Sequence, residues 1–166
     1  MSDPAEQILL SEELLALMRN AAAIAQRLKE PFITTRTLIL SLLDEPQVGA
    51  ALAEVVPREK VEALLAPEDA KPGALQLPEP KMALGERAAM QRHNTLAFKL
   101  PDGSGSMWLS HDALTAFVEG SRRAEGRYLP KHLAFGIAAE AVRTPGVFTA
   151  LHISPGTVTD AIYKLP

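Results

Sequence analysis

Apolar residues recur every three or four positions over 12–28, which is the spacing of one face of an α-helix. Ser11 stands before this run and two glutamates follow it, which is a typical signal for a helix start. Further helices are predicted over 34–45, from Pro46 and from Pro57, because threonine caps helices and proline fits a first helical turn. The pattern predicts four consecutive helices in the first part of the chain.

The same order of signals returns in the second half. Ser110 opens a long amphipathic segment, an apolar segment follows, and Pro145 and Pro155 begin two more helices. Ser110 lies 99 positions after Ser11, and Pro145 lies 99 positions after Pro46. Two copies of one four-helix unit are the simplest interpretation. Because each copy is too small for a good core, the copies should pack together.

We therefore predict one all-α domain over 1–166, made of two pseudo-repeated four-helix units at 10–65 and 109–166. The connector between them, 66–108, is rich in proline and glycine at its ends. Its sequence Pro-Asp-Gly-Ser-Gly, flanked by apolar residues, is consistent with a short β-hairpin. Long loops of this kind are often functional or disordered.

Composition narrows the class of protein. The chain has no cysteine, which excludes disulfides and thiolate metal sites and is compatible with a reducing cytosol. No signal peptide and no apolar run of the ~20 residues that span a membrane are apparent, so we expect a cytoplasmic protein without a membrane partner. The net charge is −3 and no part of the chain is strongly basic, which argues against nucleic acid.

A search for catalytic and metal-binding patterns finds none. There is no phosphate-binding loop of an NTPase, no His-Glu-x-x-His and no Gly-x-Ser-x-Gly. The four histidines lack the spacing of metal ligands. Ser110 and His111 are neighbours, and neighbours on a helix point apart, so they do not form a nucleophile and its base. We expect no enzyme activity, no metal and no cofactor.

The repeated pattern resembles the Clp N-terminal motif, which occurs twice at the front of Clp-type AAA+ unfoldases. In that motif, a helix with a Ser/Thr start and spaced alanines leads through Tyr/Phe-Ile-Gly-Thr-Glu-His into a leucine-rich helix. The matching residues are Ser11, Ala21, Ala25, Leu28, Phe32, Ile33 and Thr35 in the first copy, and Ser110, Ala113, Ala124, Tyr128, Leu129 and His132 in the second. The specific feature is the repeat of the whole pattern.

The chain departs from the family at one pair of positions. Where the family has Glu-His, this chain has Arg36-Thr37 and Lys131-His132. In the branch of the family that recognises phosphorylated arginine, that glutamate meets the guanidinium, which a cation repels. We therefore expect weak binding of phospho-arginine, and we expect Arg36 and Lys131 to favour acidic or phosphorylated partners.

The other candidate residues have two interpretations each. Ser11 and Ser110 either cap helices or contact an anion at a helix start. Thr37 and His132 either hold the joint between two helices through a hydrogen bond or contact a ligand. Trp108 either packs, as a lone tryptophan most often does, or touches a partner near the junction of the copies.

The resemblance implies a non-catalytic module that recognises substrates, adaptors or peptide-like ligands for a Clp-type unfoldase–protease system. The chain would be either the front domain of a longer unfoldase or a free-standing relative. The alternative is an accessory or decoy subunit, which docks on the Clp protease or sequesters peptide antibiotics. In each case the expected partners are proteins or peptides.

Overall fold

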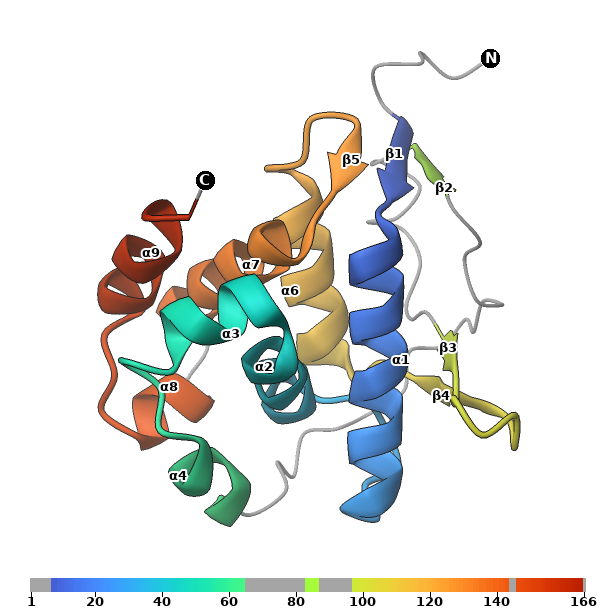
Figure 1. Cartoon of the computed structure of the whole chain (residues 1–166), viewed down its shortest axis with the longest axis horizontal. Helices are drawn as coiled ribbons and strands as arrows, with labels where there is room; N and C mark the ends of the chain where they lie inside the picture. The colour runs from blue at the N-terminus through green and yellow to red at the C-terminus, as the bar shows by residue number, and fades with distance from the viewer. Residues whose placement is uncertain (1–6, 65–82, 87–96, 144–145, 166) are drawn as a thin grey trace.

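The computed structural model describes residues 7–64, 83–86, 97–143 and 146–165, and most of these residues lie in helices (Figure 1). The chain is therefore mostly α, with a few short strands. None of the described helices is both long and apolar enough to cross a membrane. The predicted connector lies largely outside the described residues, since 66–82 and 87–96 are not among them, and so does Pro145, the predicted start of a helix.

The boundaries of the elements follow the capping and proline signals of the sequence. The helices are α1 (Glu12–Arg27), α2 (Thr35–Asp44), α3 (Pro46–Leu52), α4 (Arg58–Ala63), α6 (His111–Ser121), α7 (Pro130–Arg143), α8 (Val147–Ala150) and α9 (Pro155–Tyr163). The strands are β1 (Gln7–Leu10), β2 (Ala83–Glu86), β3 (Ala97–Lys99), β4 (Ser106–Trp108) and β5 (Arg127–Tyr128).

Helices α2 and α7 form the centre of the molecule. Helix α2 contacts α1, α3, α4, α6 and α7, and α7 also contacts α6, α8 and α9. In α2 every residue from Arg36 to Leu42 is buried, including the polar side chains of Thr37 and Ser41. Helices α1 and α9 lie on opposite sides of this pair (Figure 1).

Helices α6 and α7 approach each other closely because glycines stand where they cross. A Cβ atom placed on Gly136 would lie 2.2 Å from the carbonyl oxygen of Ala116 and 2.5 Å from the amide nitrogen of Gly120. A Cβ atom on Gly120 would lie 2.3 Å from the hydroxyl of Tyr128. That hydroxyl is fully buried and donates a hydrogen bond of 2.6 Å to the carbonyl oxygen of Phe117. No other residue type fits this crossing unless the helices move apart.

Short parallel pairings tie the start of each long helix to a distant segment. Strand β1 pairs with β5 through Leu10 and Tyr128, and the Ser11 amide donates to the Tyr128 carbonyl oxygen at 3.0 Å. In the same way Leu109 forms a parallel bridge with Ile33, and the Ser110 amide donates to the Ile33 carbonyl oxygen at 2.8 Å. The backbone before α1 is thus fixed to the backbone before α7, and the backbone before α6 to the backbone before α2.

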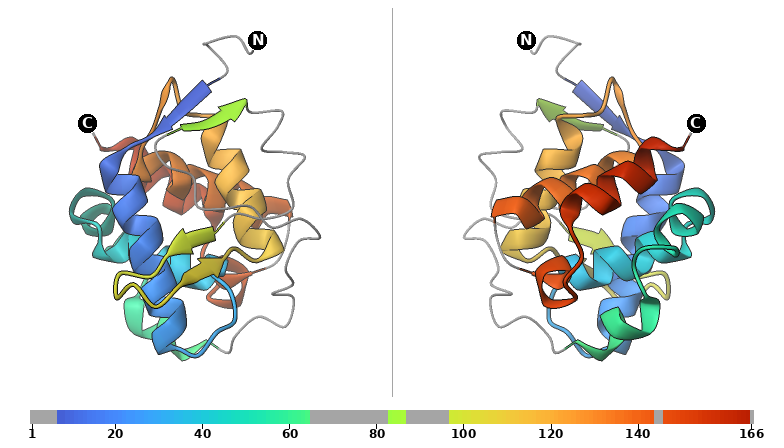
Figure 2. Two further views of the ribbon diagram at one scale, coloured as in Figure 1. Left: turned by 90° about the vertical axis from the view of Figure 1, so that its right-hand side faces the viewer. Right: turned by 90° about the vertical axis from the view of Figure 1, so that its left-hand side faces the viewer.

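The remaining strands lie beside α1. Strand β2 pairs antiparallel with β1, and β3 pairs antiparallel with β4 with Phe98 opposite Met107. Strand β3 contacts α1, and Figure 2 shows the β3–β4 pair lying across that helix. Phe98 is buried, and its ring centroid lies 6.0 Å from that of Phe117 in α6. This contact joins the strand pair to the core.

Candidate functional site

The two serines that precede the long helices are helix caps. The Ser11 hydroxyl accepts a hydrogen bond of 3.0 Å from the Leu14 amide, and the Ser110 hydroxyl accepts one of 3.2 Å from the Ala113 amide. Both serines are buried. Of their two interpretations, the structure supports capping, because each hydroxyl satisfies a helix amide away from the solvent.

Thr37 and His132 hold the starts of α2 and α7. The Thr37 hydroxyl accepts the backbone amide of Thr34 at 2.8 Å, and His132 Nδ1 accepts the backbone amide of Leu129 at 2.9 Å. Each side chain therefore reaches back three residues to the same backbone position, as in a capping box. Burial, followed by the charge of Lys131, lowers the pKa of His132, which keeps the ring neutral and able to accept this bond.

Arg36 requires a correction to the sequence-based expectation. Its side chain is only 6% exposed, and its guanidinium forms an ion pair with Glu30, which is 2% exposed. It also donates to the Leu64 carbonyl oxygen after α4. The predicted positive charge is therefore neutralised within the chain and buried at the junction of α1, α2 and α4. Arg36 does not present its charge to a partner in this structure.

Lys131 and Trp108 are the two remaining candidates, and both are half-buried. Trp108 ends β4, opposite Ala97, and its carbonyl oxygen accepts the Ile33 amide at 2.8 Å. Lys131, in the first turn of α7, lines a groove. The structure thus brings Lys131 to a site of ligand size, whereas the two serines, Thr37 and His132 cap helix starts.

We call this site the long groove, and it has two adjoining parts. The first part has a volume of about 370 Å³ and is lined by Glu13, Glu45, Pro46, Gln47, Val48, Arg127, Leu129, Pro130, Lys131 and Leu165. The second part has a volume of about 300 Å³ and is lined by Glu13, Ala16, Leu17, Asn20, Ser41, Asp44, Glu45 and Pro46. Three residues line both parts, so the groove runs from α7 past the start of α3 to the side of α1. These volumes are in the range of about 300–1,000 Å³ that is typical of ligand sites.

Charges of both signs lie together in the long groove. Glu13, Glu45, Arg127 and Lys131 all line the part beside α7, and Glu13 and Glu45 also line the part beside α1 and α2, together with Asp44. Asp44 is held by Arg58 at 2.7 Å and by Asn20 at 3.0 Å. Burial acts to raise the pKa of Asp44, but these hydrogen bonds outweigh it and lower the pKa. One oxygen of Glu45 accepts the amide of Val48 at 2.6 Å.

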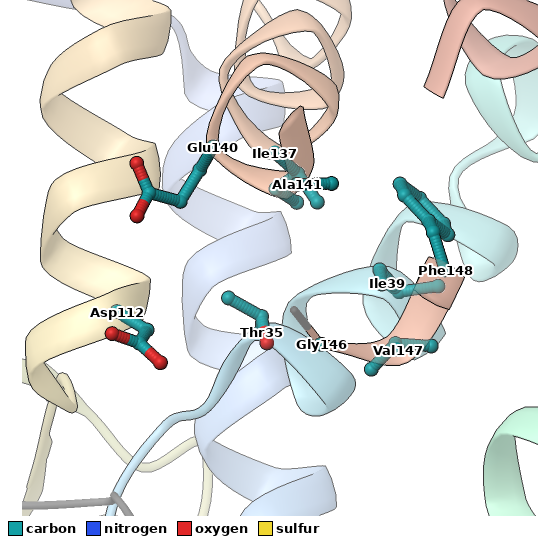
Figure 3. A pocket seen from close by; sticks show the side chains of 9 residues that line it. All are labelled: Thr35, Ile39, Asp112, Ile137, Glu140, Ala141, Gly146, Val147 and Phe148. Atoms are coloured by element: carbon teal, nitrogen blue, oxygen red, sulfur yellow. The ribbon is translucent and has the colours of Figure 1, made fainter. Parts of the chain in front are cut away.

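A second pocket lies where α6, α2 and α8 begin, beside the end of α7 (Figure 3). Its volume is only about 30 Å³, enough for a few water molecules at most. Figure 3 shows the carboxylates of Asp112 and Glu140 on one side and the side chains of Ile39, Val147 and Phe148 on the other. The apolar side chains leave little space there, so this pocket is no counterpart in size to the long groove.

Most of the groove lining is not apparent from the sequence. The position of Glu13 indicates only a helix start, and no sequence signal indicates that Glu45 and Arg127 lie in one groove. Among the described residues, no three histidine, aspartate or glutamate side chains gather in a way that could hold a metal ion. The residues that line the long groove make it an elongated surface with apolar side chains and charges of both signs.

Comparisons with known proteins do not assign a family. A scan against models of protein families finds no match to this chain, and a search of curated proteins finds none either. The likeness to the Clp N-terminal motif thus stays an expectation drawn from the sequence.

Proposed function

We propose that this chain is a non-catalytic protein-interaction domain of the Clp N-terminal type. Its long groove would take peptide segments of substrates or adaptors for a Clp-type unfoldase–protease system. The observation that carries the proposal is the reciprocal pairing of helix starts. The Ser11 amide donates a hydrogen bond to the Tyr128 carbonyl oxygen, and the Ser110 amide donates one to the Ile33 carbonyl oxygen.

This pairing supports a fold built from two pseudo-repeated units, 10–65 and 109–166. In each unit a serine-capped long helix leads to a joint, and each serine is bonded to the joint of the other unit. Thr37 and His132, 95 positions apart, form the same backbone cap in the two joints. The shared caps and the crossed bonds therefore support the proposal of an internal repeat.

The position of the long groove supports peptide binding. Its lining comes from α1, α2 and α3 of the first unit and from β5 and α7 of the second. A groove between two packed units is a common place for a ligand. Its apolar floor includes Leu17, Val48 and Leu129, and it offers a surface for apolar side chains of an extended segment.

Chemical-shift mapping tests the proposal. Unstructured peptides added to the ¹⁵N-labelled protein should shift the amides of Gln47, Val48 and Lys131 in the long groove. Gln47 is exposed, so Gln47→Trp should fill the groove and weaken binding. Ala150→Trp, on the exposed side of α8, serves as a matched control and should leave binding unchanged.

The same variants separate the proposal from the accessory-subunit alternative. A chain that binds the Clp protease ring equally well with Gln47→Trp, and that shows no groove shifts with peptides, would be a docking subunit. Shifts confined to residues outside the long groove would also overturn the proposal.

A further inference from the structure

Two exposed apolar side chains lie on neighbouring helices, α7 and α9. Val142 in α7 is 75% exposed and Tyr163 in α9 is 69% exposed, and with Leu9 they are the exposed large hydrophobic residues of the described part of the chain. Figure 2 shows α9, in red, on the side of the molecule opposite to the β3–β4 pair. A single exposed tyrosine or valine needs no explanation, so the residues around these two decide whether this face binds a partner.

Half-buried apolar residues extend this exposed surface along α7. Phe135, Ala139 and Val142 follow one another at spacings of four and three residues, so they form one stripe on the outer side of the helix. The rings of Phe135 and Tyr163 lie side by side, with their centroids 4.9 Å apart. We call Phe135, Ala139, Val142 and Tyr163 the outer patch. It is an apolar stripe on α7 that the Tyr163 ring extends onto α9.

The side of the outer patch next to α6 is basic. The Arg123 guanidinium lies over the Phe135 ring, 5.6 Å from its centroid, and forms no ion pair or hydrogen bond within the described part of the chain. Arg143 and Arg122 both contact the carboxylate of Glu119, at 3.0 and 3.9 Å. Three arginines and one carboxylate therefore stand on this side, which leaves an excess of positive charge beside the Phe135 ring.

The charge around the outer patch also differs in sign from that of the whole chain. Residues 119–165 contain six lysines and arginines and four acidic residues, whereas the whole chain contains 17 and 20. One of these four acidic residues, Glu140, is buried and lines the small pocket. A basic region on an acidic chain attracts acidic partners and repels copies of its own sign.

We propose that the outer patch is a docking surface for an acidic protein segment that carries large apolar side chains between its carboxylates. The apolar side chains pack on Val142 and Tyr163, and a carboxylate pairs with Arg123. Aromatic and arginine side chains at the centre of a surface are the residue types that contribute most to the energy of protein interfaces.

The outer patch is separate from the long groove but adjoins it. Lys131, one turn before Phe135 in α7, and Leu165, two residues after Tyr163, both line the long groove. A protein held at the outer patch would therefore stand beside the groove without filling it. The two surfaces can be tested independently, because Gln47→Trp changes the groove alone.

Three peptides with blocked termini provide the probes. Each carries one leucine and one phenylalanine in the same host sequence, and these are flanked by glutamates, by glutamines or by lysines. In ¹⁵N-labelled protein, the glutamate peptide should shift the amides of Phe135, Ala139, Val142 and Tyr163. Calorimetric titration should show that it binds about three- to five-fold more tightly than the glutamine peptide, as expected for a partly exposed ion pair, and the lysine peptide should bind most weakly. The difference should shrink at high salt.

Variants at exposed positions separate the charge from the apolar contact. Arg123→Gln should remove the advantage of the glutamate peptide and leave the affinity of the glutamine peptide unchanged. Val142→Ser should weaken both peptides by about three- to ten-fold, because apolar area is lost from the contact. Lys60→Gln in α4 and Leu9→Ser in β1 replace an exposed cation and an exposed apolar residue elsewhere, so they should change neither affinity. Melting curves followed by circular dichroism verify that each variant is folded.

Each of three results would overturn the inference. The first is equal affinity for the three peptides, the second is a set of shifts that lies outside the outer patch, and the third is a glutamate advantage that survives Arg123→Gln. A concentration-dependent dimer in sedimentation velocity that Val142→Glu abolishes would also overturn it, because the occupant would then be a second copy of the chain. Gln47→Trp should leave binding at the outer patch unchanged, so this inference and the proposed function can fail separately.

Discussion

Removing either partner of the buried Arg36–Glu30 ion pair should destabilise the fold strongly, whereas removing both should cost much less. The two side chains are 6% and 2% exposed. The Glu30 carboxylate also accepts the Thr34 hydroxyl at 3.1 Å, and Arg36 also holds the Leu64 carbonyl oxygen. The variants are Arg36→Met, Glu30→Met and the double substitution.

The magnitude follows from the charge that each single variant leaves behind. Removing one partner of a buried pair costs about 3–5 kcal/mol, because the other charge stays desolvated without compensation. A domain has roughly 5–15 kcal/mol of total stability, so either single variant brings this one near unfolding. The double variant leaves no buried charge. Its loss of stability should therefore be at least about 2 kcal/mol smaller than the sum of the losses of the two single variants. Arg36 Nε is buried without a hydrogen-bond partner, which means that the native pair is incompletely compensated.

Urea unfolding of the four proteins, followed by circular dichroism, measures these free energies. In thermal unfolding, each single variant should lose about 6–20 °C, at about 2–4 °C per kcal/mol for a chain of this size. Arg58→Met is the matched control. Arg58 and Asp44 form a pair that is 37% and 40% exposed, so its loss should cost less than about 1 kcal/mol.

The idea of a buried and coupled pair would be refuted if each single variant lost less than about 1 kcal/mol of stability and the double variant lost the sum of the two. Arg36 would then behave as a surface residue, and its charge would be available to a ligand after all. The buried pair also predicts the result of a family-like Arg36→Glu substitution. This substitution would place a second carboxylate against Glu30, so it should unfold the domain.

Three further predictions concern the joints and the helix crossing. Gly136→Ala should cost about 3 kcal/mol in urea unfolding because its Cβ would meet backbone, whereas Gly156→Ala, whose nearest atom is at 3.6 Å, should be neutral or slightly stabilising. Burial lowers the pKa of His132, so its contribution to stability is complete above pH 6.5 and is lost as the pH falls toward its folded pKa. His132→Gln, which has no titrating ring, should show a smaller decrease in melting temperature between pH 7.5 and 5.5. Lys29→Gly should stabilise the fold by about 0.5–1 kcal/mol in the same urea assay, because Lys29 has φ +59°, a left-handed conformation that glycine adopts more easily.

The sequence predicted the helices well because their signals are local. Serine caps, prolines in first turns and the spacing of apolar residues act within a few positions of where they stand. Capping by Ser11 and Ser110 is a local signal of the same kind, and it is the interpretation that their hydrogen bonds support. His132 is open to two interpretations in the sequence because its cap bond is formed by a ring nitrogen, which the sequence alone does not distinguish from a ligand contact.

The burial of Arg36 could not be predicted, since an arginine at a helix start is typical of the surface. It depends on Glu30, which is carried back over the end of α1 by a left-handed turn at Lys29. In that turn, the Glu30 amide donates to the Ala25 carbonyl oxygen at 2.8 Å, a closure that usually has glycine at its left-handed position. Because this position is occupied by Lys29, the sequence has no glycine there to indicate that the chain reverses direction.

The difference in volume between the long groove and the small pocket of Figure 3 also could not be predicted from local sequence signals. Glu13 and Asp112 stand at the same distance after their capping serines, and each lines the hollow next to its own helix start. Yet one hollow has about 370 Å³ and the other about 30 Å³. Ile39, Val147 and Phe148 line the smaller one, whereas prolines and long charged side chains line much of the larger one, where the charged ends can extend into solvent. Side-chain volume, rather than the repeated capping pattern, therefore determines which of these two helix junctions has space for a ligand.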